Sequence, residues 1–488
     1  MPVSTTRLVK RIHSSWLLTV SFSSLLLGVV AARFLPSQHW VSYAVLFSGI
    51  ALLITASVVR PRFVALTVAC LSGLLIGLWR GAVYKQSLAA YDYYYDHTVT
   101  LSGRLVTDAE TSTPSGTRLR LGDVSVQGEH AGGVVWVSTS DISEFKRSDL
   151  VTVQGELVKG FGTVPATMYR AKVLSHSRQA FSDVGGSLRD RFAAAVKLGI
   201  KNPESALANG FLVGAQSSLP EKLDANLKLL GLTHIVVASG YNLTILVRFS
   251  RRLFSKISRF ASLVAALLLV YLFTLIAGTS PSMSRAAIVV VMSLLAWFYG
   301  RKVHPVVLLF SSAGVSVLIQ PAYAWGDVGW LLSFGSFVGV LLLGPLLHTY
   351  FWHKQPASFV RQLLIETLAA YLVTLPLVIF IFGRFSPISV LANMAVLPLI
   401  SPVMALTFVA GSVSLLVPSI SKIVGFPAQF LLQYVTMVVN WLAGYSSASK
   451  EMSMSLIGLI VSYGVLLIFM LFLWRRSGHE FRDFNVVE

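Results

Sequence analysis

The stretch GLTHIVVASGYNLTIL, residues 231–246, decides the fold because polar side chains interrupt an otherwise apolar run. It carries His234, Ser239, Gly240 and Asn242 within a segment that has the character of a membrane helix. Each unpaired polar group in hydrocarbon costs several kcal/mol, so a helix that only anchored the chain would use Leu, Ile and Val there. The stretch therefore predicts a helix that faces other helices and a polar path.

The composition of the whole chain is that of a membrane protein. Of the 488 residues, 55% are apolar and 12% are charged, whereas soluble domains have about 25% charged residues. Many apolar runs reach the roughly 20 residues needed to cross a bilayer. We expect a polytopic α-helical membrane protein with about 12 spans. The expected spans are residues 15–33, 40–59, 63–84, 232–249, 260–278, 284–300, 303–319, 329–347, 363–382, 388–416, 423–444 and 453–474.

The net charge of +18 does not by itself indicate nucleic-acid binding, because of where it lies. Residues 1–90 carry 8 basic and 0 acidic side chains, and residues 232–488 carry 16 and 6. The basic clusters fall on alternate connections between the expected spans, which is the positive-inside pattern. This pattern predicts a multi-pass protein of the cell (plasma or inner) membrane, with both termini in the cytoplasm and residues 85–231 outside.

The external region shows two patterns. Over residues 97–178, five short runs alternate apolar and polar residues, which predicts a small antiparallel barrel of the OB type. A generic β-domain that only packs on the membrane part is an equal alternative. Within residues 181–231, the stretches SLRDRFAAAVKLGI at 187–200 and LPEKLDANLKLLG at 219–231 have helical spacing, and they would lie along the outer membrane surface or pack on the β-domain. The expected domains are 1–90, an N-terminal three-helix membrane unit; 91–180, the external OB-like β-domain; 181–231, external amphipathic helices; and 232–488, the membrane core.

The sequence has few elements of a catalytic site. The histidines are scattered, the single cysteine, Cys70, cannot build a thiolate site or an intramolecular disulfide, and no Gly-rich phosphate loop is present. Ser239 and His234 are five residues apart, about 140° around a helix, so they do not pair with each other as nucleophile and base. We expect no enzyme activity, no metal and no cofactor.

Polar residues in or beside the expected spans are the candidates for a substrate path, because such groups usually face the bundle interior or a watery cavity. The alternative is that they are structural contacts between helices or snorkel to the interface. Gly240 permits either a close helix approach or a local break. Pro398 and Pro402 leave open whether residues 388–416 form one span or a re-entrant pair. The candidates are His234, Ser239, Gly240, Asn242, Arg285, Asp327, Glu366 and Asn393.

Four stretches together resemble ComEC-type DNA internalisation competence proteins, in that family's order. They are GFLVGAQSSLPEKLDANLKLLGLTHIVVASGYNLTIL, which ends with the stretch quoted first, GTSPSMSRAAIVVVM at 278–292, DVGWLLSFGSFVGVLLL at 327–343 and SPISVLANMAVLPLISP at 386–402. The three N-terminal helices and the external OB-like domain also fit that family. Asn242 differs, because many relatives have His there. The chain also ends at Glu488 without the metallo-β-lactamase-like domain of many relatives, so it resembles the form that lacks this domain.

The resemblance implies a membrane channel that passes single-stranded DNA into the cytoplasm during natural transformation. A negatively charged strand needs a hydrated path with polar or positive walls. His234, Ser239 and Asn242 would supply hydrogen bonds on those walls, and Arg285 would supply positive charge. The implied partners are single-stranded DNA, membrane lipids, a separate nuclease, a DNA receptor, and a cytoplasmic helicase or single-strand-binding proteins. The alternatives are a transporter or flippase for an anionic or lipid-linked substrate, and a purely structural assembly protein.

The external domain would then be a loading platform, since OB-folds commonly stack bases on aromatic rings beside a basic groove. The candidate DNA contacts are Arg118, Arg120, Trp136 and Tyr169. Residues 91–180 carry 9 basic and 10 acidic side chains, so we expect weak binding or none. The sequence leaves open whether Trp136 faces a base or the barrel interior.

Overall fold

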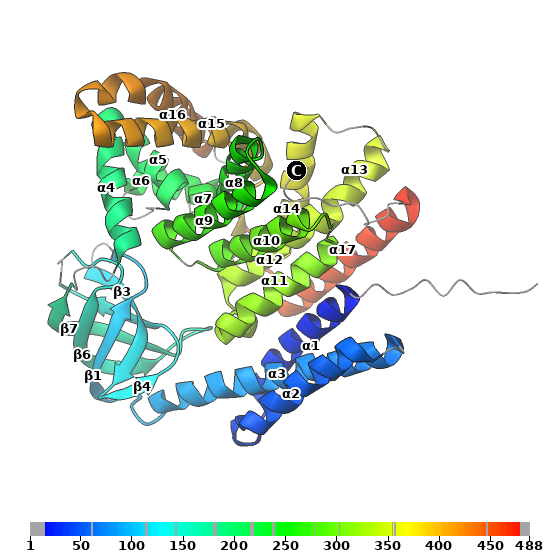
Figure 1. Ribbon diagram of the computed structural model, residues 1–488. Coiled ribbons are helices and arrows are strands. Elements are labelled where there is room, and N and C mark those ends of the chain that lie inside the picture. The colour runs from blue at the N-terminus through cyan, green and yellow to red at the C-terminus, as the bar shows by residue number, and fades with distance from the viewer. Residues whose placement is uncertain are drawn as a thin grey trace, which may run out of the picture. The chain divides into compact units, whose positions relative to one another are not determined.

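The chain divides into two compact units. Figure 1 shows the ribbon coloured by residue number, from blue at the N-terminus to red at the C-terminus. One comprises Met1–Ala89 and Val306–Trp325, and the other comprises Ala90–Pro305 and Gly326–Glu488. This computed structural model describes residues 15–478 except 60–61, 113–115, 142–143, 179–182, 215–218, 237–239, 279, 302, 354, 356–357 and 446–447.

The first unit is a bundle of apolar helices. They are α1 (Ser15–Phe34), α2 (Tyr43–Val58), α3 (Arg62–Leu88) and α11 (Pro305–Ile319), with the 3-10 turns η1 (Ser37–His39) and η4 (Pro321–Trp325). Helix α3 presents Gly73, Gly77 and Gly81, spaced four apart, to α1. A Cβ on Gly77 would lie 2.2 Å from the carbonyl oxygen of Leu25, so small residues allow the two backbones to touch.

Helix α11 belongs to this first unit and not to the membrane core in which the sequence analysis placed it. Arg80 of α3 donates from Nε to the carbonyl oxygen of Leu318 at 2.7 Å and from Nη2 to that of Ile319 at 2.9 Å. These are the last carbonyls of α11, which lack partners within the helix. The arginine therefore holds the end of α11 against α3.

The second unit contains the β-domain and the remaining helices. The helices are α4 (Val184–Gly199), α5 (Glu204–Val213), α6 (Glu221–Leu229), α7 (Thr233–Val236), α8 (Gly240–Phe254), α9 (Arg259–Ala277), α10 (Pro281–Phe298), α12 (Val328–Val338), α13 (Gly344–Trp352), α14 (Phe359–Phe382), α15 (Ser389–Leu416), α16 (Ser421–Ala443) and α17 (Leu456–Ser477). Short elements are η2 (Ala89–Tyr91), the π-helical η5 (Gly339–Leu343), η6 (Pro418–Ile420) and the paired strands β8 (Arg384–Phe385) and β9 (Lys450–Glu451). Serine side chains cap several helix starts: Ser258, Ser280 and Ser358 each accept from the backbone N–H three residues on.

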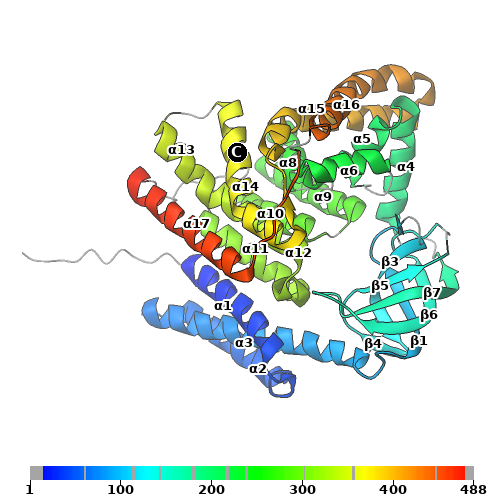
Figure 2. The same ribbon diagram turned by 180° about the vertical axis from the view of Figure 1, so that it is seen from behind.

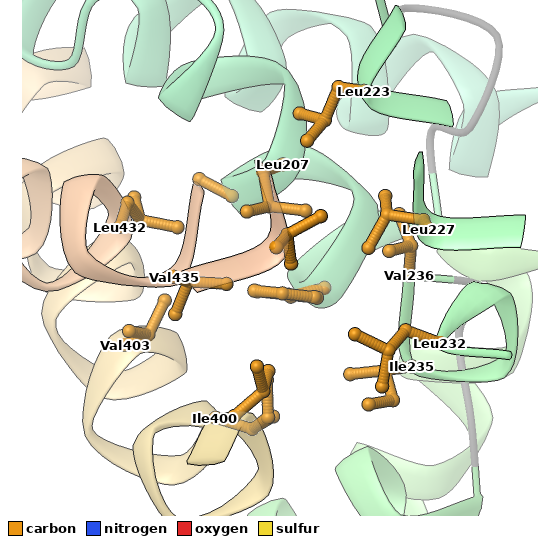
Figure 3. Close-up of a cluster of buried hydrophobic side chains, with 14 of the residues drawn as sticks. Leu207, Leu223, Leu227, Leu232, Ile235, Val236, Ile400, Val403, Leu432 and Val435 are labelled. Atoms are coloured by element: carbon orange, nitrogen blue, oxygen red, sulfur yellow. The ribbon is translucent and has the colours of Figure 1, made fainter. Parts of the chain in front are cut away.

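The core of the second unit surrounds α5, all ten residues of which are buried. In Figure 3, Leu207 of α5 lies between side chains of α16, such as Val435, and side chains of α6 and α7, such as Leu227. Figure 2 shows α15 and α16 as neighbouring helices, with α4 between them and the β-domain. The two stretches expected on the outer membrane surface or on the β-domain, 187–200 and 219–231, contribute α4 and α6, and both pack on α16. The helix between them, α5, was not singled out from the sequence and fills the interior of the helical core.

The β-domain is a closed barrel, as expected for an OB-like domain. Its strands are β1 (Thr98–Leu105), β2 (Glu110–Ser112), β3 (Gly116–Val126), β4 (Glu129–Ala131), β5 (Val135–Thr139), β6 (Leu150–Lys159) and β7 (Ala166–Ser177). Five of them close in the order β1-β6-β7-β5-β3 and back to β1. The β5–β7 pair is parallel and the others are antiparallel, so the barrel is not wholly antiparallel as predicted. Alternate residues of β3, such as Leu119 and Leu121, are buried, and the alternation shifts by one residue between Leu121 and Val124.

A buried carboxylate joins the two ends of the barrel's last hairpin. Asp149, just before β6, has a side chain that is 1% exposed. It accepts from Arg178 at 2.8 and 2.9 Å, from His176 Nε2 at 2.8 Å and from the backbone N–H of Lys146 at 2.9 Å. Burial alone would raise the pKa of Asp149, but these hydrogen bonds, chiefly that of Arg178, outweigh burial and lower the pKa to about 2.

A second charged contact attaches the barrel to the helices. Arg147 binds the carboxylate of Asp183 through Nε at 2.5 Å and Nη2 at 2.7 Å. Its Nη2 also donates to the carbonyl oxygen of Leu275, near the end of α9, at 2.9 Å. Asp183 in turn caps α4 by accepting from the N–H of Gly186 at 2.6 Å. One arginine of the barrel therefore joins the start of α4 to the end of α9.

Eight helical segments of the described chain are long and apolar enough to cross a membrane. They are Ser15–Phe34, Arg62–Tyr91, Arg259–Ala277, Val328–Trp352, Phe359–Phe382, Ser389–Leu416, Pro418–Ala443 and Leu456–Ser477, and α2, α10 and α11 are shorter apolar helices. The polytopic helical architecture with a barrel domain is confirmed, whereas a count of about 12 spans stays a prediction.

Two of the expected spans correspond to the following helices. Within residues 232–249 the structure describes α7, which ends at Val236, and α8, which begins at Gly240, and residues 237–239 lie outside the described residues. Residues 389–416 do form one continuous helix, α15, which runs through both Pro398 and Pro402. The alternative of a re-entrant pair separated by a break is therefore not seen.

We expect residues 91–178 to fold alone, because the barrel strands close on one another. In that fragment Asp149→Asn should lower the free energy of unfolding by about 2 kcal/mol at pH 7, since each pKa unit corresponds to about 1.4 kcal/mol. A lowered folded-state pKa stabilises the fold above the unfolded-state value near 4, and this contribution is lost as the pH falls from about 4 towards 2. Urea denaturation followed by circular dichroism measures it.

The matched control is Glu129→Gln, which removes one negative charge at an exposed position of β4. It should change the unfolding free energy little at any pH. Equal effects of the two substitutions, or a fragment that does not fold, would contradict the role given to Asp149.

Candidate functional site

Three of the motif-bearing stretches meet around Arg285. Gly240 is the first residue of α8, and a Cβ there would lie 2.8 Å from Cβ of Ala286 and 3.7 Å from Nη2 of Arg285. The guanidinium carbon of Arg285, on α10, lies 5.9 Å from the ring centroid of Phe334 and 5.1 Å from that of Phe337, both on α12. We refer to Gly240, Arg285, Phe334 and Phe337 as the Arg285 cluster.

The cluster has a positive charge and no negative charge among its members. Arg285 takes part in none of the ion pairs formed by the described residues, and its Nε is buried without a hydrogen-bond partner. The faces of the two phenylalanine rings attract a cation, but this cation–π interaction is worth only about 1–2 kcal/mol. A cation held among apolar helices without a carboxylate is suited to an anionic ligand.

Local sequence explains how the cluster is built. Ser280 caps α10 and Pro281 occupies its first position, so Arg285 lies in the second turn of the helix. Asp327 caps α12 by accepting from the N–H of Trp330 at 2.7 Å. Immediately after Phe337 and Val338 the helix continues as the π-helical η5, a form that often occurs at functional sites.

Gly240 shows the close helix approach that the sequence left open, because its missing side chain lets α8 lie against Ala286. The glycine is therefore required for space, because its neighbour across the interface already carries a Cβ. Residues 237–239 lie outside the described residues, so the local break stays a prediction.

The two asparagine candidates are buried and donate hydrogen bonds to backbone carbonyl oxygens. Asn242 is 1% exposed and donates from Nδ2 to the carbonyl oxygen of Phe211 at 2.8 Å, which ties α8 to the buried α5. Asn393 is 4% exposed and donates to the carbonyl oxygen of Ser389 at 2.8 Å within α15. A Cβ on Gly231 would lie 3.0 Å from the hydroxyl oxygen of Ser389, so this stretch of α15 packs on the start of the stretch quoted first.

The remaining path candidates have local partners. His234 is exposed, and its Nδ1 lies 2.9 Å from the carbonyl oxygen of Gly231. Glu366 accepts from Nε2 of Gln362 at 2.8 Å and interacts electrostatically with Arg248. Ser239 lies outside the described residues. The structure thus brings Gly240 and Arg285 together, and the hydrogen bonds that it shows for the other described candidates lead elsewhere.

A separate group of aromatic and basic side chains lies on the outside of the barrel. Trp136 alternates with the buried Val135 and Val137, so its ring is on the outer face. It pairs across the strands with Arg120. The guanidinium carbons of Arg118 and Arg120 lie 5.5 and 5.4 Å from its ring centroid.

Two further aromatic residues extend this outer face. Phe161, in the loop between β6 and β7, meets Trp136 edge-on with ring centroids 5.2 Å apart. Tyr169 of β7 is 60% exposed and follows Met168, which is opposite Val137 in the register. Phe161 was not predicted, although an aromatic residue beside the glycines of a hairpin loop was a visible signal. We refer to Arg118, Arg120, Trp136, Phe161 and Tyr169 as the Trp136 surface.

Comparison with known proteins identifies the helical part. A family model described as Competence protein matches residues 211–477, more than half of the chain. This chain belongs to the competence protein family. The matched range contains the whole Arg285 cluster, whereas the barrel and the Trp136 surface lie before it.

One curated relative of this competence-family chain is ComE operon protein 3 of Bacillus subtilis (strain 168). It is 26% identical over 199 residues, which cover 40% of this chain and 25% of the relative. The aligned segment thus spans a quarter of that relative's length. No solved structure matches the chain.

Within the described ranges, no group of three or more His, Cys, Asp or Glu side chains could hold a metal ion. The expectations of no metal, no cofactor and no enzyme activity remain predictions.

The close approach at Gly240 gives a direct test of the cluster's packing. Gly240→Ala should destabilise the detergent-purified protein by about 1–3 kcal/mol, because the new Cβ overpacks against Ala286. Adding Ala286→Gly should restore most of the loss by removing the opposing methyl group. The thermal unfolding midpoint, followed by fluorescence, measures both.

Gly464→Ala in α17 is the matched control, since a Cβ there would meet nothing within 4 Å. It should be neutral or slightly stabilising, because alanine favours helix more than glycine does. If Ala286→Gly does not restore the stability lost in Gly240→Ala, the contact between residues 240 and 286 is not what requires glycine at position 240.

Proposed function

We propose that this competence-family protein is the membrane channel that passes a single strand of DNA into the cytoplasm during natural transformation. The observation that carries the proposal is Arg285, a cation that has no carboxylate partner among the described residues and lies at the meeting point of three motif-bearing helices. A phosphodiester backbone supplies the missing negative charge, one phosphate at a time. A single strand also exposes bases that stack on aromatic rings, and Phe334 and Phe337 are adjacent.

The Trp136 surface supports a role for the barrel in loading the strand. In OB-folds the second and third strands and the loop between the fourth and fifth strands commonly bind oligonucleotides. Here β3 and β5 are the second and third strands of the closed barrel, and the loop with Phe161 joins the fourth and fifth. All five residues of the surface lie on these elements or on the neighbouring β7.

The proposal includes a topology and a set of partners. Both termini would lie in the cytoplasm, and residues 85–231 would lie outside, where the barrel meets incoming DNA. A separate nuclease would degrade the other strand, a receptor would deliver DNA, and a cytoplasmic helicase or single-strand-binding protein would receive it. His234, Ser239, Asn242, Asp327, Glu366 and Asn393 would line or support the path.

The alternative is a transporter or flippase for an anionic small or lipid-linked substrate, because a single unpaired cation also suits one phosphate. The two functions differ in what crosses the membrane. If the entry of long labelled strands depends on Arg285, the channel function is supported. If strands enter normally in cells that lack the protein, the transporter or flippase function is the one that remains.

Arg285→Gln should reduce DNA entry in cells that carry it as their only copy. Losing a hydrogen-bonded charge to phosphate costs about 1.5–3 kcal/mol, so we expect entry to fall roughly ten- to hundredfold. Arg285→Lys keeps the charge and should retain part of the activity. The measurement is the amount of labelled DNA protected from external nuclease, at equal protein levels in the membrane.

Arg301→Gln is the control, since it removes the same charge from an exposed loop position. It should leave entry near the wild-type level. Normal entry with Arg285→Gln would refute the path beside Arg285.

The isolated barrel, residues 91–178, should bind single-stranded DNA more tightly than duplex DNA, because stacking needs unpaired bases. Trp136→Ala and Phe161→Ala should each weaken binding by about 1–3 kcal/mol if their rings stack on bases. Both rings lie outside the barrel, so circular dichroism should remain unchanged. Fluorescence anisotropy with labelled oligothymidine at several salt concentrations measures the affinity.

The charge control compares Arg118→Gln/Arg120→Gln with Lys159→Gln/Lys172→Gln, which remove equal charge from different parts of the barrel. The arginine pair should cause the larger loss. A folded barrel that binds no DNA even at low salt would remove the loading role and leave the barrel a structural domain.

A further inference from the structure

A basic segment lies at the junction between α8 and α9. Residues 248–259 contain five basic side chains and no acidic one. Two of the five are directed to other parts of the fold: Arg251 lies 4.2 Å above the ring of Trp297, and Arg248 interacts with Glu366. The other three are exposed and belong to none of the ion pairs of the described residues. They are Arg252, Lys256 and Arg259.

Large apolar side chains alternate with these charges. Phe249, Leu253 and Ile257 are 69%, 57% and 72% exposed. Their spacing of four residues places them on one helical face. The helical turn continues past the end of α8, since the N–H of Ile257 donates to the carbonyl oxygen of Phe254 at 3.0 Å. An apolar stripe therefore runs beside the basic stripe of Arg252 and Lys256.

The two stripes border a shallow hollow. This depression of about 300 Å³ is open to the surface and is lined by Phe249, Arg252, Leu253 and Lys256. The next helix, α9, starts at Arg259 and is long and apolar enough to cross a membrane. The hollow is thus close in sequence to the end of a candidate span, where headgroups and acyl chains meet.

We propose that this hollow binds an anionic phospholipid from the surrounding bilayer. Arg252 and Lys256 contact the headgroup phosphate, and Phe249 and Leu253 pack against the first part of an acyl chain. Clusters of basic residues on an amphipathic helix attract anionic headgroups. The general positive-inside bias accounts for the charges but not for the exposed apolar stripe between them.

A DNA strand fits the hollow less well than a lipid. Bases gain affinity by stacking on aromatic rings, and of the three stripe residues Leu253 and Ile257 are aliphatic. Aliphatic side chains pack well on hydrocarbon and stack poorly on bases. The composition of the stripe therefore favours an acyl chain as occupant, with the charge supplied by the headgroup.

The test uses the purified full chain in detergent micelles. It is titrated with dioctanoyl phosphatidylglycerol, which is anionic, and with dioctanoyl phosphatidylcholine, which is zwitterionic, and the bound lipid is counted by native mass spectrometry. Each basic residue near an anionic surface contributes about a fivefold gain in binding. We expect phosphatidylglycerol to bind at least about tenfold more tightly than phosphatidylcholine, and Arg252→Gln/Lys256→Gln to remove this preference.

Lys159→Gln/Lys172→Gln in the barrel is the matched control and should leave the preference intact. Equal affinity for the two lipids, or an unchanged preference in the Arg252→Gln/Lys256→Gln variant, would overturn the site. A twenty-residue oligothymidine serves as competitor. If it displaces phosphatidylglycerol and loses its own binding in the same variant, the hollow is a nucleic-acid surface and the lipid proposal fails.

Discussion

The close approach of α8 to α10 at Gly240 is the contact on which the arrangement of the helical core depends. It leaves no room for a side chain, and it places the guanidinium of Arg285 within 3.7 Å of the position that such a side chain would occupy. The rings of Phe334 and Phe337, both on α12, also lie beside the guanidinium of Arg285. Three stretches that are up to about a hundred residues apart in sequence therefore share one small volume.

The second constraint is the attachment of the barrel. Arg147 satisfies the carboxylate of Asp183 and the last carbonyls of α9 together, and α9 leads through Gly278 to the capped start of α10. Gly278 has a φ of +87° and would, with a side chain, place a Cβ 2.9 Å from Nη1 of Arg147. The barrel is thus attached to the chain a few residues before the helix that carries Arg285.

Sequence patterns predicted the features that depend on local periodicity. The alternation over residues 97–178 predicted the barrel and showed that Trp136 and its neighbouring valines lie on opposite sides of one strand. It did not show which of the two sides faces the interior. Four ordered motifs indicated the family, and they contain the whole Arg285 cluster, although only Gly240 and Arg285 were singled out from the sequence. The motifs did not distinguish Arg285, which has no ion pair among the described residues, from Asp327, which caps a helix, or from Asn242, which joins two helices.

Other features depend on contacts between distant residues, which periodicity does not reveal. The interior position of α5 is an example, because its buried Glu204 finds hydrogen-bond donors more than 200 residues away in the sequence. Glu204 accepts from Gln429 at 3.1 Å and from Thr436 at 3.3 Å. The grouping of α11 with the N-terminal helices is another. Phe161 joins Trp136 only because the β6–β7 loop folds over the outer face of the barrel.

The central claim is that a DNA strand passes beside Arg285, and site-specific cross-linking tests it most directly. The photoreactive residue p-benzoylphenylalanine would replace Phe337, which contacts Arg285, or Phe430, which is 64% exposed on α16. Cells would be illuminated while taking up labelled DNA, and covalent protein–DNA adducts would be counted. The account predicts adducts at position 337 and none above background at position 430. Normal DNA entry with no adduct at 337, or equal adducts at both positions, would contradict it.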